Sequence, residues 1–279
     1  MTRTIRIPNI LGKINYIRAG SGKPVVLIHG IAASLHDWDE MSFRLNEAGC
    51  ETFALDLPGH GNSDKPEDIY FYHIGNFVSL LVDWIDLLKL ETAPILIGHS
   101  MGGYLALEYA LRYPSFTRAL VLIDPFFSPE QIPVPLRAGF NSRFLATLQK
   151  KEAPVWQYDF AVDCISFLNP GAHFLKHDLP RPARKQMSLN YRLAAPAVLE
   201  LPFTARNLEP FLPQLSLPVL VIYGERDLTL SPKSFARLVN ILPNAKGVGI
   251  KAGHVPHLSN AGEVNLLVKN FVDRLSVPS

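Results

Sequence analysis

The stretch Ile95-Leu-Ile-Gly-His-Ser-Met-Gly-Gly103 decides how this chain folds. It begins with three apolar residues, Ile95–Ile97, that predict a short buried strand, and it leads into a helix-like segment, Tyr104–Arg112. Between the two stands a Gly-x-Ser-x-Gly pattern, in which the serine occupies a strained turn and the glycines avoid clashes with neighbouring backbone. Such a turn lifts the Ser100 hydroxyl above a sheet edge and toward a helix N-terminus, where free N–H groups stabilise negative charge. We therefore predict that Ser100 is a nucleophile.

Other short apolar runs without alternation predict further strands that are buried on both faces of a parallel sheet. These runs are Val25–Ile28, Thr52–Leu55, Ala119–Ile123, Val219–Tyr223 and, more weakly, Val248–Ile250. Helix-like stretches separate them, at Ile74–Lys89, from Pro232 onward and at Glu263–Leu275. Near the start, the residues of Thr4–Ile7 and Ile14–Arg18 alternate, which favours an antiparallel edge. The succession of strands and helices predicts a doubly wound α/β sheet with right-handed crossovers.

Proline is concentrated in one part of the chain. The sequence has 23 prolines in 279 residues, above the usual ~5%, and 12 of them fall within residues 125–213. No comparable strand pattern appears in that segment, which is rich in aromatic residues. Because a loop of this length is unusual inside a compact domain, we expect an inserted, mostly helical cap or lid at 125–213. The core is then formed by 1–124 and 214–279.

Length and composition exclude several classes of protein. At 279 residues, 48% of them apolar, the chain can form one large domain with a sizeable core. Two cysteines, Cys50 and Cys164, cannot build a disulfide framework or a multi-cysteine metal site. A net charge of +2 argues against a dedicated nucleic-acid binder. Neither a signal-peptide core nor an apolar run long enough for a membrane span is apparent, so we expect a cytoplasmic protein. We also expect it to be a monomer or a homodimer.

A serine hydroxyl becomes a good nucleophile only when a base removes its proton and an acid orients that base. In a sheet of this kind the partners follow the serine in the order acid, then histidine, beyond the carboxyl ends of later strands. Asp227 follows the run that ends at Tyr223, and His254 follows the run that ends at Ile250. We predict Asp227 as the acid and His254 as the base.

Acyl transfer through a tetrahedral intermediate also needs two backbone N–H groups aimed at the oxyanion. One is predicted at Met101, directly after the nucleophile. The other is predicted in the loop His29–Ser34, which follows the run Val25–Ile28, and we choose Ile31 as its donor.

Five motifs together resemble the α/β-hydrolase fold superfamily. They are His29-Gly30, Asp56-Leu-Pro-Gly-His-Gly-Asn-Ser-Asp64, the Gly98–Gly102 pattern, Gly224–Asp227 and Gly253-His254. The match is to the branch of small bacterial esterases, carbon–carbon bond hydrolases and cofactor-free haloperoxidases, and it covers 1–124 and 214–279. The resemblance implies a mostly parallel eight-stranded sheet, a Ser-His-Asp site without metal or cofactor, and a structural loop around His60.

The sequence leaves one alternative residue open for the base and one for the acid. His257 lies three residues after His254 and is the nearest rival for the base, although a glycine directly before His254 favours the latter. Asp124 ends the run Ala119–Ile123 and is the other carboxylate placed to orient a histidine, whereas Asp227 sits in the better-matched loop.

Departures from the family narrow the reaction. Ser100 argues against haloalkane dehalogenases and soluble epoxide hydrolases, which place Asp at this position. Ring-cleavage carbon–carbon hydrolases usually carry Asn at the position of His99 and a Pro-Gly-rich oxyanion loop. This chain has neither feature, so carbon–carbon bond hydrolysis stays open only as a less favoured alternative. Lactone opening, peracid formation, hydroxynitrile lyase activity and a receptor that retains the triad also stay open. We expect an enzyme that hydrolyses carboxylic esters of small, largely apolar substrates through an acyl-enzyme on Ser100.

Three aromatic residues are candidate substrate contacts: Trp38 after the oxyanion loop, and Phe126 and Trp156 in the lid. A packing role is the alternative for each of them. The expected partner is a small-molecule ester or related acyl substrate. No cofactor, metal or nucleic acid is expected.

Overall fold

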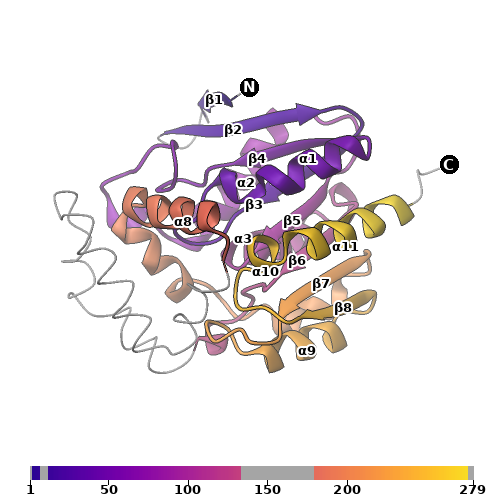
Figure 1. Cartoon of the computed structure of the whole chain (residues 1–279). Helices are drawn as coiled ribbons and strands as arrows, with labels where there is room; N and C mark the ends of the chain where they lie inside the picture. The colour runs from indigo at the N-terminus through magenta and orange to yellow at the C-terminus, as the bar shows by residue number, and fades with distance from the viewer. Residues whose placement is uncertain (1, 7–11, 133–178, 276–279) are drawn as a thin grey trace.

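The computed structural model describes residues 2–6, 12–132 and 179–275. Within them, eight strands form one sheet in the order β1-β2-β4-β3-β5-β6-β7-β8 (Figure 1). The strands are β1 (Thr2–Arg6), β2 (Lys13–Gly20), β3 (Lys23–Ile28), β4 (Cys50–Leu55), β5 (Ile95–His99), β6 (Ala119–Ile123), β7 (Val219–Gly224) and β8 (Ala245–Ile250). Neighbours from β4 to β8 are parallel, whereas β2 pairs antiparallel with both β1 and β4. The predicted mostly parallel sheet with an antiparallel edge is therefore confirmed.

Helices cover both faces of this sheet. They are α1 (Asp39–Glu47), α2 (Ile74–Leu87), α3 (Met101–Arg112), α8 (Arg181–Leu193), α9 (Pro232–Ile241), α10 (Pro256–Ser259) and α11 (Ala261–Arg274). Helices α2, α3 and α9 bury apolar side chains in a core on one face. Helices α1 and α11 do so on the other face, where they lie side by side (Figure 1). No helix of the described residues is long and apolar enough to cross a membrane.

Successive residues of the central strands alternate between these two cores. In β3, Val26 and Ile28 belong to the core with α2, α3 and α9, while Val25 and Leu27 belong to the core with α1 and α11. All four side chains are fully buried, and burying each contributes about 1.5–3 kcal/mol. Because both faces are covered, the strand needs no polar residues, which explains its uninterrupted apolar sequence.

The described part of the predicted lid is helical. Besides α8 it contains short 3₁₀ helices at Pro129–Gln131, Pro196–Phe203 and Glu209–Gln214, and each of the four elements has a proline in its first turn. Val198, Leu201, Leu208 and Leu212 pack into the core with α2 and α3. Residues 133–178 of the predicted lid lie outside the described residues, so the lid as a separate unit stays a prediction. Three further 3₁₀ helices lie at Leu35–Trp38, Ile69–Phe71 and Pro114–Phe116.

Candidate active site

The tight turn between β5 and α3 presents Ser100. Its backbone angles, φ 51° and ψ −115°, lie in a region that side chains rarely adopt. The Ser100 N–H donates to the carbonyl of Ile123 in the neighbouring β6 at 3.0 Å. The Ser100 carbonyl in turn accepts a hydrogen bond of 2.9 Å from the Phe126 N–H. These bonds from the adjacent strand hold the strained turn in place.

Glycine is required on both sides of the serine. A Cβ atom added to Gly98 would collide with the backbone of Gly102, and one added to Gly102 would collide with the carbonyl of Ile28 in β3. The chain can therefore turn this tightly, and α3 can begin this close to β3, only without side chains at these positions. The geometry agrees with the clash that the sequence pattern predicted.

His254 reaches Ser100 from the loop after β8. His254 Nε2 lies 3.0 Å from Ser100 Oγ, and His254 Nδ1 lies 2.7 Å from Asp227 Oδ2. An ionised carboxylate only accepts, so Nδ1 carries the ring proton and Nε2 is free to accept from the serine hydroxyl. Asp227 is completely buried, and the His254 side chain is 12% exposed. The structure thus brings together the three side chains predicted as nucleophile, base and acid.

The loops after β7 and β8 fix the acid. Asp227 Oδ1 accepts hydrogen bonds from the N–H groups of Thr229 at 2.7 Å and Leu230 at 3.0 Å, which leaves Oδ2 for the histidine. A Cβ atom on Gly224, the last residue of β7, would collide with the carbonyl of Gly253 beside the base. Gly224 therefore lets the two loops meet closely enough for the acid to reach the ring.

Within the described residues, Asp124 and His257, the alternatives to Asp227 and His254, form no hydrogen bond to Ser100 or to the His254 ring. Asp124 is buried beside Asp227, and its Oδ1 accepts the Gly224 N–H at 2.8 Å, whereas the carboxylate that accepts a hydrogen bond from His254 Nδ1 is that of Asp227. Neither ring nitrogen of His257 has a hydrogen-bond partner among the described residues, and both are buried. His257 instead stacks on Trp38, with ring centroids 5.0 Å apart.

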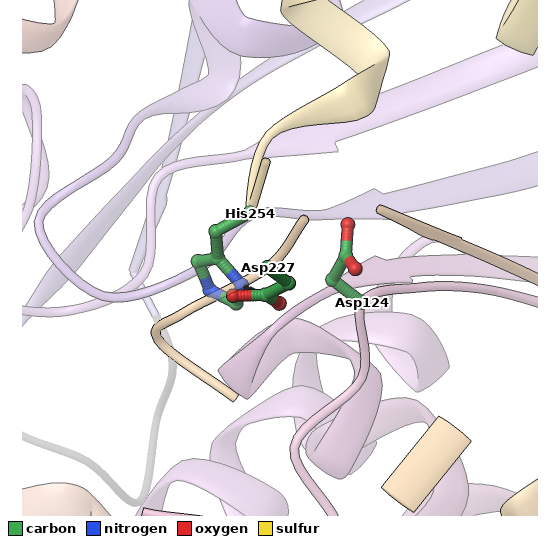
Figure 2. A group of neighbouring side chains, drawn as sticks. All are labelled: Asp124, Asp227 and His254. Carbon is green, nitrogen blue, oxygen red and sulfur yellow. Dashed lines mark hydrogen bonds and ion pairs between the residues drawn. The ribbon is translucent and has the colours of Figure 1, made fainter. Parts of the chain in front are cut away.

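Asp124, Asp227 and His254 also form a set of potential metal ligands, because one atom from each lies within 4.8 Å of the others (Figure 2). Carboxylates and imidazoles are ligands that divalent metals use. Here, however, both oxygens of Asp227 already take part in hydrogen bonds, one of them with the His254 ring. The contacts of this group are those of a hydrogen-bonded acid and base, and the metal-free site stays a prediction.

The predicted oxyanion donors lie at the same sheet edge as Ser100. Met101 is the first residue of α3, and Ile31 follows β3, which pairs directly with β5. A Cβ atom on Gly30 would come within 3.2 Å of the Ser100 Cβ, so this loop lies against the nucleophile. Among the described residues, neither the Ile31 nor the Met101 N–H has a hydrogen-bond acceptor. Their role as oxyanion donors stays a prediction.

Asp56 holds that loop, a contact that the sequence analysis missed. Its Oδ1 accepts the Leu35 N–H at 2.9 Å, and its Oδ2 accepts from Asn15 Nδ2 at 2.7 Å and from the Asn62 N–H at 2.9 Å. The carboxylate, 1% exposed, therefore joins the loop after β3 to the loop after β4 and to β2. The Asp56–Asp64 motif was the available signal, but it does not say which main-chain groups the acid binds.

Four buried histidines, His29, His60, His99 and His257, have lowered pKa values. Burial is the largest cause that lowers the pKa of each, because a charged ring would lose its hydration. It lowers the pKa of His60 and of His257 to about 3. The pKa of His29 and of His99 is lowered as well, that of His99 strongly. His60 Nδ1 donates to the Pro58 carbonyl at 2.9 Å, which agrees with a structural role.

The candidate substrate contacts have different surroundings. Trp38 is 0% exposed and belongs to the core with α1 and α11. Phe126 is 2% exposed and packs beside Tyr104, with ring centroids 5.7 Å apart. Trp156 lies outside the described residues. Contact with substrate stays a prediction for all three.

Known proteins resemble this chain over most of its length. The 1-acylglycerol-3-phosphate O-acyltransferase ABHD5 of Rattus norvegicus is 27% identical over 294 aligned residues, which cover 90% of this chain and 77% of the relative. The cis-3-alkyl-4-alkyloxetan-2-one decarboxylase of Shewanella oneidensis is 26% identical over 261 residues, 84% of this chain and 76% of the relative. A thermophilic esterase from Thermogutta terrifontis superposes with a TM-score of 0.79 at 21% identity, covering 99% and 100% of the two chains.

The strand order, the strained serine turn and the loops that follow β7 and β8 agree with the resemblance found in the sequence. The family model described as the alpha/beta hydrolase fold matches residues 23–261, and the chain belongs to this family.

Proposed function

We propose that the chain is a serine hydrolase that cleaves carboxylic esters of small, largely apolar substrates. The 3.0 Å contact between Ser100 Oγ and His254 Nε2 carries this proposal. The 2.7 Å contact between His254 and the buried Asp227 supports it, because a base that is oriented by a buried carboxylate can activate a hydroxyl. Esterases among the solved structures of this fold agree with the proposal.

The geometry leads to a two-stage reaction. Ser100 Oγ attacks the ester carbonyl carbon while His254 Nε2 takes its proton, and Asp227 stabilises the imidazolium. The N–H groups of Ile31 and Met101 stabilise the oxyanion, each by about 3–4 kcal/mol. When the intermediate collapses, His254 gives the proton to the leaving alcohol. Water, deprotonated by His254, then releases the acyl group and restores Ser100.

The nucleophile is tested with a chromogenic short-chain ester and a fluorophosphonate probe. We expect Ser100→Ala to abolish both hydrolysis and labelling. The matched control is Ser79→Ala, because Ser79 is an exposed serine of α2, and it should retain both. Hydrolysis by Ser100→Ala at the wild-type rate would contradict the proposal.

The acid is tested by comparing two isosteric variants. Asp227→Asn removes the charge that orients His254, so kcat should fall by about 10²–10⁴. Asp124→Asn should lower kcat far less, because Asp124 does not bind the ring. A larger loss at position 124 would reverse the assignment.

A second candidate is transfer of the acyl group to an alcohol rather than to water. The observation that favours it is the 27% identity, over 90% of this chain, with a relative named 1-acylglycerol-3-phosphate O-acyltransferase. The acyl-enzyme is the same in both reactions, so only the acceptor distinguishes them. We would follow an acyl donor with and without 1-acylglycerol-3-phosphate. A diacyl product formed at the expense of free acid identifies transfer, and free acid alone identifies hydrolysis.

The same substrate panel separates the remaining alternatives. A lactone, a vinylogous diketone, and an ester with hydrogen peroxide report lactone opening, carbon–carbon cleavage and peracid formation. The lactone is included because one relative is named for an oxetan-2-one, which is a four-membered lactone. A chain that takes up the fluorophosphonate but turns over no substrate would be a ligand-binding receptor with an intact triad.

A further inference from the structure

Two buried carboxyl groups meet beside the base. Asp124, after the end of β6, and Asp227, after β7, are each 0% exposed. One oxygen from each and a ring nitrogen of His254 all lie within 4.8 Å of one another. In Figure 2, Asp227 lies between His254 and Asp124. Two negative charges this close together in a buried site would repel each other strongly.

The Asp227 carboxyl group has more hydrogen-bond donors around it than the Asp124 carboxyl group has. Asp227 has the partners of an ionised carboxylate, since Oδ1 accepts two main-chain N–H groups and Oδ2 faces His254 Nδ1. Asp124 has one such donor, the Gly224 N–H, at its Oδ1. The other oxygen, Asp124 Oδ2, is buried, and no N–H or O–H group of a described residue donates a hydrogen bond to it. An ionised Asp124 would therefore leave a charged oxygen without a donor.

The main chain fixes Asp124 in this place. Its φ is 41°, a strained value, and its N–H donates to the carbonyl of Ile222 in β7 at 2.9 Å. Its side chain binds Gly224, the last residue of the same strand. Backbone and side chain are thus both tied to the strand that leads into the Asp227 loop. The carboxyl group cannot turn away from Asp227 without breaking the hydrogen bond from the Gly224 N–H.

We propose that Asp124 is a positioning residue that carries a proton on Oδ2 and donates it in a hydrogen bond to the Asp227 carboxylate, so that the pair holds a single negative charge. The proton turns the contact from a repulsion between two anions into a hydrogen bond to a charged acceptor. That bond holds Asp227 against His254. The inference rests on the proposed function only for the part that Asp227 and His254 play in turnover.

The electrostatics of the site agree with this assignment. Burial first, and then the charge of Asp227, raise the pKa of Asp124 well above its usual range, while the Gly224 N–H opposes the shift. Asp227 also acts on Asp124 as a hydrogen-bond partner. Among the acidic and histidine side chains of the described residues, those that face Asp124 are Asp227, from the loop after β7, and His254, from the loop after β8. This direction favours the protonated form of Asp124.

The first test needs no substrate. Infrared spectroscopy of the full chain at pH 7 detects the C=O stretch of a protonated carboxyl group. We expect such a band in the wild type and in Ser100→Ala, and its loss in Asp124→Asn. Identical wild-type and Asp124→Asn spectra in this region would overturn the inference. Because no ester is involved, failure of the proposed hydrolysis would leave this result standing.

The second test compares Asp124→Asn with Asp124→Leu. Asparagine can accept the Gly224 N–H and donate to Asp227, as the protonated acid does, whereas leucine fills the space without hydrogen bonds. We expect kcat to fall about threefold in the asparagine variant and about 30-fold in the leucine variant, with little change in KM. Equal losses in the two variants would mean that only packing matters and would overturn the inference.

A third test uses the pH profile of kcat/KM, because a change in side-chain packing alone would not shift this profile. An ionised Asp124 would favour the charged form of His254, so replacing it with asparagine would move the acid limb to lower pH. A protonated Asp124 is already neutral, and the acid limb of Asp124→Asn should coincide with that of the wild type. A shift to lower pH would overturn the inference, even where the leucine variant does not fold.

Discussion

His99 Nε2 lies 2.7 Å from the main-chain carbonyl oxygen of His254, so the residue before Ser100 holds the loop that carries His254. The carbonyl can only accept, and Nε2 therefore bears the ring proton. Burial, followed by the neighbouring His257 and His254 rings, lowers the pKa of His99 well below its ordinary value, which keeps the ring neutral. The turn that carries Ser100 and the loop that carries His254 are thereby joined by a hydrogen bond that does not depend on the serine hydroxyl.

We predict that His99→Gln retains about half of the wild-type kcat, while His99→Asn lowers kcat about tenfold with little change in KM. A glutamine amide can place an N–H where Nε2 lies, whereas the shorter asparagine reaches only the position of Nδ1. An unsatisfied buried carbonyl costs about 1–3 kcal/mol, enough to loosen the His254 loop. Steady-state kinetics on the chromogenic ester measure the effect, and equal kcat values in the two variants would contradict it.

Gly102, in the turn that carries Ser100, gives a prediction for thermal stability. Gly102→Ala should unfold the chain or lower its melting temperature strongly, because the new Cβ would meet the main-chain carbonyls of Ile28 and His29 rather than a movable side chain. Gly262→Ala is the matched control: it lies in α11, with nothing within 4 Å of the added Cβ. It should raise stability by about 0.5–1 kcal/mol, since alanine favours helix. Similar losses in both variants would refute the steric explanation.

Acid should destabilise the fold through the buried neutral histidines. The folded pKa values of His60 and His257 are about 3, below the unfolded value near 6.5. Between these values the unfolded chain binds protons that the folded chain does not. The free energy of unfolding therefore falls by about 1.4 kcal/mol per pH unit for each ring as the pH drops. His257→Phe should lose stability less steeply between pH 7 and pH 5 in thermal unfolding, and an unchanged slope would exclude this cause.

Glu108 ties the end of the predicted lid to the helix that follows the nucleophile. This glutamate of α3 is 2% exposed and accepts hydrogen bonds from Arg206 at 2.8 Å and from Arg112 at 3.2 Å. Glu108→Gln weakens the charged hydrogen bonds to two half-exposed arginines, and we expect a cost of about 1.5–2 kcal/mol. Asp86→Asn breaks an exposed pair with Lys89 and should cost less than about 0.5 kcal/mol. Denaturant unfolding compares the two, and a similar cost for both would contradict the prediction.

Local patterns in the sequence were enough to predict the central strands of the sheet and the tight turn at Ser100. Strands buried on both faces leave uninterrupted apolar runs, and the predicted boundaries of β6 match the observed ones. The edge strand β8 begins at Ala245, before the predicted Val248, because its first residues are exposed and carry no apolar signal. Helix α1 was not predicted, since only Met41 and Leu45 of its side chains are buried.

Contacts between distant parts of the chain could not be predicted in this way. The hydrogen bond from His99 to the carbonyl of His254 spans 155 positions, and no periodicity or local motif reports it. The sequence offered Asp124 and Asp227 as competitors for one role. The structure instead places them side by side, a relationship that depends on the pairing of β6 with β7.

The order of strands in the sheet has a consequence for how the enzyme is made. On the proposed roles, the base follows the nucleophile by 154 residues and enters through β8, the strand at the far edge of the sheet. During synthesis, a chain that has already emerged through Ser100 and Asp227 still lacks the group that activates the hydroxyl. On these roles, the Ser100 hydroxyl is activated only after His254 has been translated and β8 has joined β7.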